Sequence, residues 1–147
     1  MNKTTLKDKL IEIQKTIVNE LNEKIVTTHS MVDVDESDTI DPEDLSHQTE
    51  SMLTEQLFKV KLQKAENDLR LLDQINFDSK TMVEPGAFIK TEMFHFVIAT
   101  ATIPFDLDGM HIIGLSSESP IYLEMKGLLK GDKFNFSDKS YTILEIH

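Results

Sequence analysis

Apolar residues recur at helical spacing through the first part of the chain. Between Thr4 and His29 they fall four, three, four, four and four positions apart, at Leu6, Leu10, Ile13, Ile17, Leu21 and Ile25. This spacing places one apolar stripe along a helix. No glycine or proline interrupts the segment, and Thr4 or Thr5 can cap its start. We therefore predict a first helix from residue 4 to about residue 29.

A second helix has a clear start signal at Asp41 and Pro42. Aspartate is a good N-cap, proline suits the first helical position, and Glu43 and Asp44 then lie at the positive end of the helix dipole. Apolar residues follow in two registers, first Leu53, Leu57 and Val60 and then Leu62, Ala65, Leu69 and Leu72. A stripe that winds around a partner shows such a shift. We predict a second helix from residue 42 to about residue 73, packed antiparallel on the first, stripe to stripe, as a coiled coil.

The second half of the chain has the pattern of a small sheet domain. A linker rich in turn-forming residues follows residue 73, and we place the domain boundary between residues 77 and 78, which gives domains 1–77 and 78–147. Strands are predicted at 87–91, 94–103, 110–115, 133–136 and 141–146, with turns at 104–109 and 137–140. A short helix opens at Ser119 and Pro120 and closes at Gly127. One helix over a mostly antiparallel sheet makes the fold class α+β.

The connection between the two predicted helices is strongly acidic. Residues 33–44, DVDESDTIDPED, hold seven carboxylates and no basic residue. The net charge of −11 is local to this region, because the chain without the stretch between Lys24 and Lys59 carries 15 positive and 17 negative residues. Unpaired carboxylates avoid burial, so the run faces water, a cation or a basic partner. A solvated connection between helices is the simplest interpretation, and an acidic tip that reaches a target is the alternative.

Composition narrows the class of protein. A chain of 147 residues with 39% apolar and 28% charged residues is typical of one ordinary or two small folded domains. The absence of cysteine excludes disulfides and cysteine-based zinc sites. We expect a cytoplasmic, unprocessed monomer that does not enter a membrane, since no apolar run approaches the ~18 residues of a membrane span. The absence of a basic face argues against direct, sequence-specific nucleic-acid binding.

The acidic run also has some features of an EF-hand calcium loop. Oxygen ligands fall at the expected positions Asp33, Asp35, Ser37, Thr39, Asp41 and Asp44. Against this interpretation, Asp38 occupies the position where the loop needs glycine, and Asp44 is shorter than the usual bidentate glutamate. Pro42 also starts a helix inside the loop. Calcium binding of this type is therefore the weaker alternative.

Three features of the second half resemble a known family. The segment 112–132, IIGLSSESPIYLEMKGLLKGD, has a strand ending in serine, a Ser-Pro pair, a short helix, a glycine and then Gly-Asp. It is followed by the closing strand YTILEI at 141–146, and Gly86 precedes the first strand. Together these resemble the C-terminal domain of the bacterial Gre transcript cleavage factors, over most of residues 83–147. The resemblance implies an FKBP-like sheet domain behind an N-terminal coiled coil with an acidic tip.

The resemblance also implies a function. Gre factors bind RNA polymerase and insert the coiled coil into its secondary channel, where acidic tip residues help to hold a Mg²⁺ ion for hydrolysis of backtracked RNA. By this likeness the chain is an auxiliary elongation factor and not itself an enzyme. Candidate Mg²⁺ ligands at the tip are Asp38, Asp41 and Asp44, and the candidate polymerase-binding residues are Glu118, Ser119 and Pro120.

The tip departs from the family signature Asp-Leu-Ser-Glu-Asn. Asp44, Leu45 and Ser46 match its first three positions, but His47 and Gln48 replace the acidic residue and the asparagine. Two hypotheses stay open: a factor that stimulates RNA cleavage, and a regulator that occupies the channel without cleavage. A metal-binding or purely structural coiled-coil module is a third. Prolyl isomerase activity is disfavoured, because the domain has no Trp and no evident aromatic pocket.

The remaining chemistry of the second half is sparse. His95 and His111 lie in predicted strands among apolar neighbours, so we expect both to be structural. The spacing supports no Ser-His-Asp arrangement, and the chain has no glycine-rich phosphate loop and no H-E-x-x-H motif.

Overall fold

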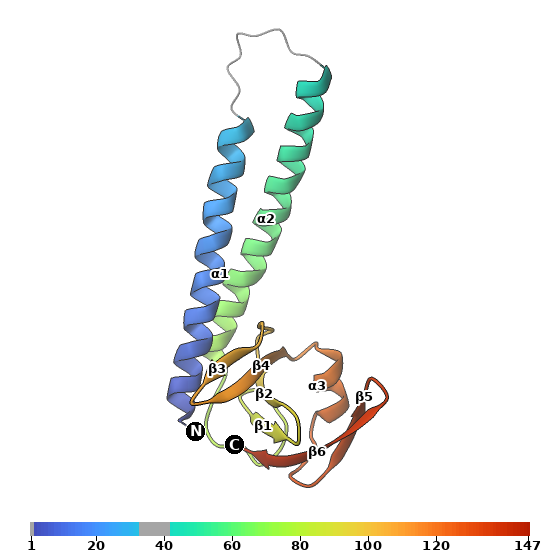
Figure 1. Ribbon diagram of the computed structural model, residues 1–147. Coiled ribbons are helices and arrows are strands. Elements are labelled where there is room, and N and C mark those ends of the chain that lie inside the picture. Colours follow the sequence, from blue (N-terminus) through green and yellow to red (C-terminus); the bar gives the residue numbers. More distant parts are fainter. Residues whose placement is uncertain (1, 33–41) are drawn as a thin grey trace. The chain divides into compact units, whose positions relative to one another are not determined.

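The computed structural model describes residues 2–32 and 42–147, without the side chains of Met31, Val32 and Asp44. Two long helices come first and a sheet domain follows (Figure 1). The elements are α1 (Lys3–Val32), α2 (Pro42–Gln74), β1 (Phe88–Thr91), β2 (His95–Ala99), β3 (Phe105–Leu107), β4 (Met110–Ser116), α3 (Pro120–Met125), β5 (Lys133–Phe136) and β6 (Lys139–Ile146). The predicted helical pair followed by an α+β sheet domain is confirmed.

Packing divides the chain into two compact units. One comprises residues 13–69, the greater part of both long helices, and the other comprises residues 1–12 and 70–147, the helix ends with the sheet domain. The predicted domain boundary between residues 77 and 78 is a statement about which segments, 1–77 and 78–147, fold independently. It stays a prediction.

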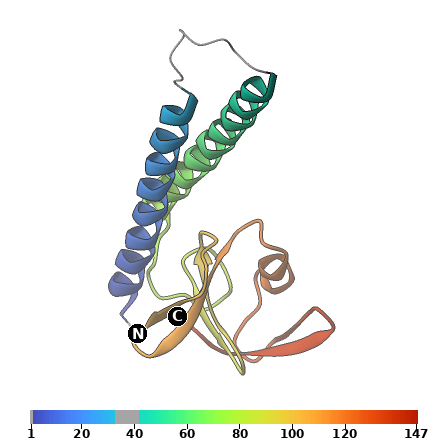
Figure 2. The same ribbon diagram turned by 45° about the horizontal axis from the view of Figure 1, so that its top comes forward.

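In the helical unit, α1 and α2 run antiparallel and lie side by side (Figures 1 and 2). Leu21 of α1 and Ala65 of α2 are buried, and so is the polar Gln14, which is only 2% exposed. Gln14 Nε2 donates a hydrogen bond of 3.0 Å to the backbone oxygen of Ala65. The buried stripe of α1 therefore includes Gln14. The neighbouring Ile13, which was predicted to lie in the stripe, is only half-buried.

The prediction that Leu53, Leu57 and Val60 pack on the first helix is wrong. These side chains are 68%, 51% and 58% exposed. The inward face of α2 is instead formed by Phe58, Leu62, Ala65 and Leu69, which are buried or half-buried. Each residue rotates the helix by about 100°, so the two apolar registers of α2 lie on different sides of it. The second register, which begins at Leu62, faces α1, and the first register faces away from α1. Continued toward residue 42, the inward face becomes polar, with Ser51, Thr54 and Glu55 half-buried.

The sheet has six strands in the order β3-β4-β2-β1-β6-β5. It is mixed, because β2 pairs in parallel with β4, while every other neighbouring pair of described strands is antiparallel. Two predicted boundaries need correction. The strand expected at 94–103 is β2 alone and ends at Ala99, and the turn expected at 104–109 contains the edge strand β3.

The missed strand returns through a tight turn into β4. Asp108 and Gly109 both have positive φ, 52° and 74°, as a type I′ hairpin turn requires. Ser137 and Asp138, at 50° and 62°, turn β5 into β6 in the same way. After β2 the chain runs to the edge of the sheet and forms β3. It then turns back into β4, which lies between β3 and β2 and is parallel to β2.

One face of the sheet carries the main core, and α3 covers it. The buried core residues are Val83, Ala87, Ile89, Phe96, Ile98, Leu115, Tyr122, Met125, Phe134, Tyr141 and Ile143. The helix ends of this unit bury Leu6, Leu10 and Leu72 completely. Near them, Lys3 Nζ donates to the backbone oxygen of Gly86 at 2.7 Å. These contacts tie the start of α1 and the end of α2 to the sheet domain within this unit.

Candidate functional site

The predicted polymerase-binding residues lie together where β4 passes into α3. The backbone N–H of Ser119 donates to the oxygen of Ser116 at 3.1 Å, which closes a turn at the end of β4. Ser119 is the N-cap of α3, and Pro120 is its first residue, where no N–H is needed. Glu118 and Pro120 are exposed and Ser119 is half-buried. The turn therefore presents Glu118 and Pro120 on the surface with a fixed backbone.

The short helix holds this turn rigidly against the core. Tyr122 and Met125 are buried on the inner side of α3. Burial, followed by the nearby Glu84 carboxylate, raises the pKa of the Tyr122 hydroxyl, so this side chain stays neutral near pH 7. On the outer side, Leu123 is 59% exposed one turn after Pro120. We call Glu118, Ser119, Pro120 and Leu123 the Ser-Pro surface.

Sequence reasoning missed Leu123 as a surface residue. The signal was its position three residues after Pro120, because residues i and i+3 share a face of a helix. The same spacing rule assigns the neighbouring Tyr122 and Met125, also three apart, to the inner side. Leu123 therefore lies on the same exposed side of α3 as Pro120.

The acidic tip is only partly described. Asp38 and Asp41 lie outside the described residues, and so does the predicted capping role of Asp41. Asp44 is the third residue of α2, and the position of its side chain is not part of the description. Over residues 2–32 and 42–147, no group of three or more His, Asp or Glu side chains could hold a metal ion. The Mg²⁺ site therefore stays a prediction.

The residues that align with the Gre signature lie in the first two turns of α2. Leu45, Ser46 and His47 are exposed, and Gln48 is half-buried. An imidazole thus occupies the surface position at which the family signature has a carboxylate. Neutral imidazole is a poor ligand for Mg²⁺, which prefers oxygen donors.

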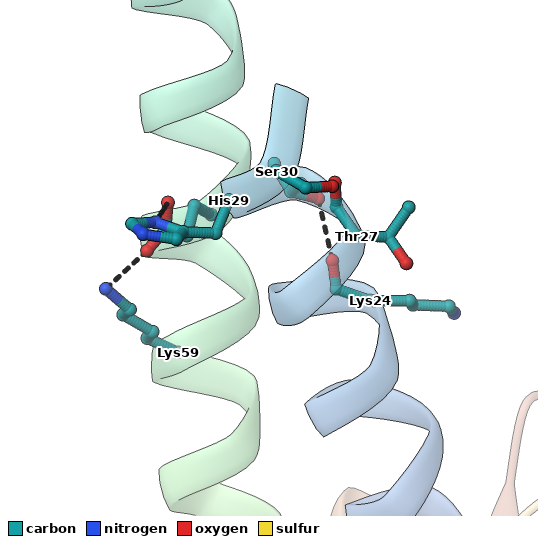
Figure 3. A network of polar contacts seen from close by, with 7 residues as sticks. Lys24, Thr27, His29, Ser30 and Lys59 are labelled. Carbon is teal, nitrogen blue, oxygen red and sulfur yellow. Dashed lines mark hydrogen bonds and ion pairs between the residues drawn. The ribbon is translucent and has the colours of Figure 1, made fainter. Parts of the chain in front are cut away.

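Polar contacts join the two helices near the acidic connection (Figure 3). The carboxylate of Glu55 in α2 contacts both His29 Nδ1 of α1, at 3.3 Å, and Lys59 Nζ of α2. The hydrogen bond from Lys59, and then that from His29, lowers the pKa of Glu55. Beside them, Lys24 Nζ lies 5.9 Å from the centre of the Phe58 ring. A groove of about 300 Å³ lies there, lined by Glu20, Glu23, Lys24, Thr27, Thr28 and Phe58.

The two strand histidines each have a polar partner, in agreement with the structural role expected for them. His111 Nδ1 lies 2.8 Å from the Asp106 carboxylate, on the neighbouring strand. His95 Nδ1 lies 3.3 Å from the backbone oxygen of His111, and its ring stacks on Phe88. These contacts join neighbouring strands, from β3 through β4 and β2 to β1.

No protein-family model matches the chain, and no curated protein matches it. The solved structures that are similar to it include the following two. One, described as the GreA factor homolog 1 (Gfh1) protein of Thermus thermophilus, has 14% identity and a TM-score of 0.38, and the match covers 93% of this chain and 94% of that one. The other, described as the transcription factor Gfh1, has 14% identity and a TM-score of 0.37, with 96% and 92% covered. In the described residues no helix is long and apolar enough to cross a membrane.

Proposed function

We propose that this chain binds RNA polymerase as a transcription elongation factor, with its helical pair in the secondary channel and its Ser-Pro surface on the rim. The observation that supports this best is the Ser-Pro turn, which follows β4, opens α3 and exposes Glu118 and Pro120 on a base anchored by Tyr122 and Met125. The sequence of this segment resembles the Gre rim-binding segment. This role places the chain in the cytoplasm.

The helical pair has dimensions suited to a channel. At ~1.5 Å per residue, the 30 residues of α1 and the 33 of α2 span roughly 45 and 50 Å. Two packed helices are narrow, and in the sequence seven carboxylates occupy residues 33–44, the segment that joins α1 to α2 together with the first residues of α2. A long, narrow element with charge at its end is what reaching a buried active site requires.

The chemistry of the tip fits a shared Mg²⁺ ion. Asp38, Asp41 and Asp44 offer hard oxygen donors, and Mg²⁺ binds through one or two carboxylates together with water and phosphate oxygens. The ion would supply charge stabilisation and a bound water at the RNA phosphate. The chain itself contributes the carboxylates and their delivery, so the polymerase is the enzyme.

The exposed His47 favours a second candidate, a factor that occupies the channel without stimulating cleavage. It removes one of the two acidic positions of the Gre signature. The two candidates share the binding mode and differ in the tip alone. They can therefore be separated by whether the bound wild type stimulates RNA cleavage.

The binding test uses purified RNA polymerase and the full chain. We expect the double variant Glu118→Ala/Pro120→Ala to lose at least ~10-fold in affinity, because it removes a charge and the residue that fixes the turn. Asp8→Ala, an exposed carboxylate on α1, is the matched control and should bind like the wild type. Equal affinity of the double variant and the control would refute the assigned docking surface.

The tip test measures cleavage of backtracked RNA across a range of Mg²⁺ concentrations. Asp38→Asn/Asp44→Asn should keep polymerase binding and abolish any Mg²⁺-dependent cleavage, because it removes two formal charges and little volume. His47→Glu should increase cleavage. A wild type that binds without stimulating cleavage at any Mg²⁺ concentration identifies the channel-occupying regulator.

A further inference from the structure

The outer side of α2 carries an apolar face in its first half. Its members are exposed by 51% to 68% and all belong to the helical unit: Leu45, Met52, Leu53, Leu57 and Val60. At about 100° per residue these five side chains spread over less than half of the helix circumference, opposite the inward residues Phe58, Leu62 and Ala65. We call this set the outer α2 face. Scattered exposed apolar residues need no explanation, but a contiguous face indicates an interaction site.

The distribution of polarity in this half of α2 strengthens the point. Toward α1 the helix presents Ser51, Thr54 and Glu55, and the polar contacts of Glu55 with His29 join the helices there. Of the six large apolar side chains between residues 45 and 60, five lie on the other side, and Phe58 alone faces α1. Because burial of apolar surface is the main driving force of helix packing, this half of α2 is better suited to a partner on its outside than to α1.

We infer that the outer α2 face binds the same face of a second copy of this chain, with the two α2 helices antiparallel across a two-fold axis. The evidence for this occupant is the order of charges along the edge of the face beside Leu57. Glu43 and Glu50 lie toward the start of α2, and Lys61 lies toward its end. All three side chains are exposed, whereas Lys64, one turn further along, is paired with Asp68 at 2.6 Å. The edge is therefore complementary to itself when it is reversed.

In an antiparallel pair each copy contributes this order of acidic and basic residues, so the complementary charge contacts form twice. With the axis near Gln56, Glu50 of each copy faces Lys61 of the other, and the leucines and Val60 fill the seam between them. In a parallel pair this edge would lie beside the opposite edge of the partner helix, so Glu50 and Lys61 of the two copies would not meet. A two-fold arrangement also ends at the dimer, since the outer α2 face of each copy is occupied by that of its partner.

The size of the face sets the expected strength. Residues 45–64 extend over roughly 30 Å of helix, so the face is smaller than the ~800 Å² per partner of a standard stable interface. We expect a dissociation constant on the order of micromolar or weaker, in the range of transient complexes. A dimer of this strength leaves the monomer expected from the sequence as the form at low concentration. The inference does not depend on polymerase binding, and its test contains no polymerase.

The first test is sedimentation equilibrium of the full chain over a concentration series that extends into the millimolar range. The wild type should pass from monomer to dimer, and Leu53→Gln/Leu57→Gln should weaken the dimer at least ~100-fold, because two apolar side chains are lost from each copy. Val26→Gln is the matched control, since Val26 is an equally exposed apolar residue on α1, and it should leave the dimer unchanged. Equal circular dichroism of all variants establishes that the helices are intact.

The second test asks for the antiparallel arrangement. Glu50→Lys and Lys61→Glu should each weaken the dimer several-fold, and the double exchange should restore it. Since the chain has no cysteine, Gln56→Cys can report the axis by oxidation to a cross-linked dimer. Thr49→Cys should cross-link poorly, because in an antiparallel pair the two residues 49 lie about 14 residues, or ~21 Å, apart.

Four results would overturn the inference. A wild type that stays monomeric throughout the series excludes the second copy and leaves the face to a different partner. A dimer that survives Leu53→Gln/Leu57→Gln uses another surface. A double charge exchange that fails to restore association, or efficient cross-linking through Thr49→Cys, excludes the antiparallel pair.

Discussion

Replacing Gln14 by leucine should stabilise the protein. Gln14 is 2% exposed in the seam between α1 and α2, and only half of its amide is used. Its Nε2 donates to the Ala65 backbone oxygen at 3.0 Å, whereas its Oε1 has no hydrogen-bond partner among the described residues. The substitution removes the unpaired acceptor and keeps a side chain of similar size.

The magnitude follows from three contributions. Relief of a buried unpaired acceptor is worth about 1–3 kcal/mol, and loss of the bond to Ala65 costs about 0.5–1.5 kcal/mol. Ala65 loses little, because its oxygen also accepts the regular bond within α2. Added apolar burial contributes roughly 0.8 kcal/mol per CH₂ group. The expected net gain is about 1–2 kcal/mol, or an increase in melting temperature of roughly 3–6 °C for a chain of this size.

The assay is thermal and urea unfolding followed by circular dichroism, with Lys15→Leu as the matched control. Lys15 is exposed on the neighbouring position of α1, so its replacement should change the free energy of unfolding by less than about 0.5 kcal/mol. A loss of stability on Gln14→Leu would refute the reasoning. It would show that Oε1 is satisfied, for example by a bound water, and that Gln14 contributes to the stability of the pair.

Two further predictions concern the sheet unit. Gly86→Ala should destabilise the protein by about 2–4 kcal/mol in urea unfolding, since a Cβ there overlaps the Asn76 backbone oxygen at a φ of +88°, whereas Gly109→Ala, with open space around it, should lose only about 1 kcal/mol. Burial, and then the charge of Lys80, lowers the pKa of Lys3 from 10.5 to about 8. The unfolded chain therefore binds more protons than the folded chain between pH 8 and 10.5, and the stability of wild type relative to Lys3→Met should rise across this range. An unchanged or falling difference would contradict the lowered pKa.

Sequence patterns predicted the helices and most strands well, because their signals are local. The apolar stripe of α1, the Asp-Pro start of α2 and the alternation in β5 each depend on neighbouring residues only. The strand β3 could also have been found. Asp108-Gly109 is the strongest short signal for a two-residue hairpin turn, and the prediction treated it as an ordinary loop.

The parallel pairing of β2 with β4 could not be predicted in the same way. It depends on which strands meet in space, and no local pattern determines that choice. The misplacement of Leu53, Leu57 and Val60 has a similar cause. Both apolar registers of α2 have helical spacing, and only the packing of the whole pair decides which one faces α1.

The candidate site was predicted in part. Glu118, Ser119 and Pro120 were identified from a motif, and the structure brings them together on one exposed turn. Leu123 was missed because an isolated leucine in a short helix is ordinarily a core residue. The tip residues Asp38, Asp41 and Asp44 stay predictions from the charge pattern and from the likeness to the Gre signature.

The measurement that tests the central claim most directly is localised cleavage of RNA polymerase from the end of the helical pair. Because the chain has no cysteine, Ser46→Cys provides a single site on the exposed surface of α2 for a tethered iron chelate that generates hydroxyl radicals. If the pair enters the secondary channel, the polymerase should be cut next to its catalytic metal centre, and the cuts should disappear with Glu118→Ala/Pro120→Ala. Binding that gives cuts only on the outer surface of the polymerase, or none, would contradict the account.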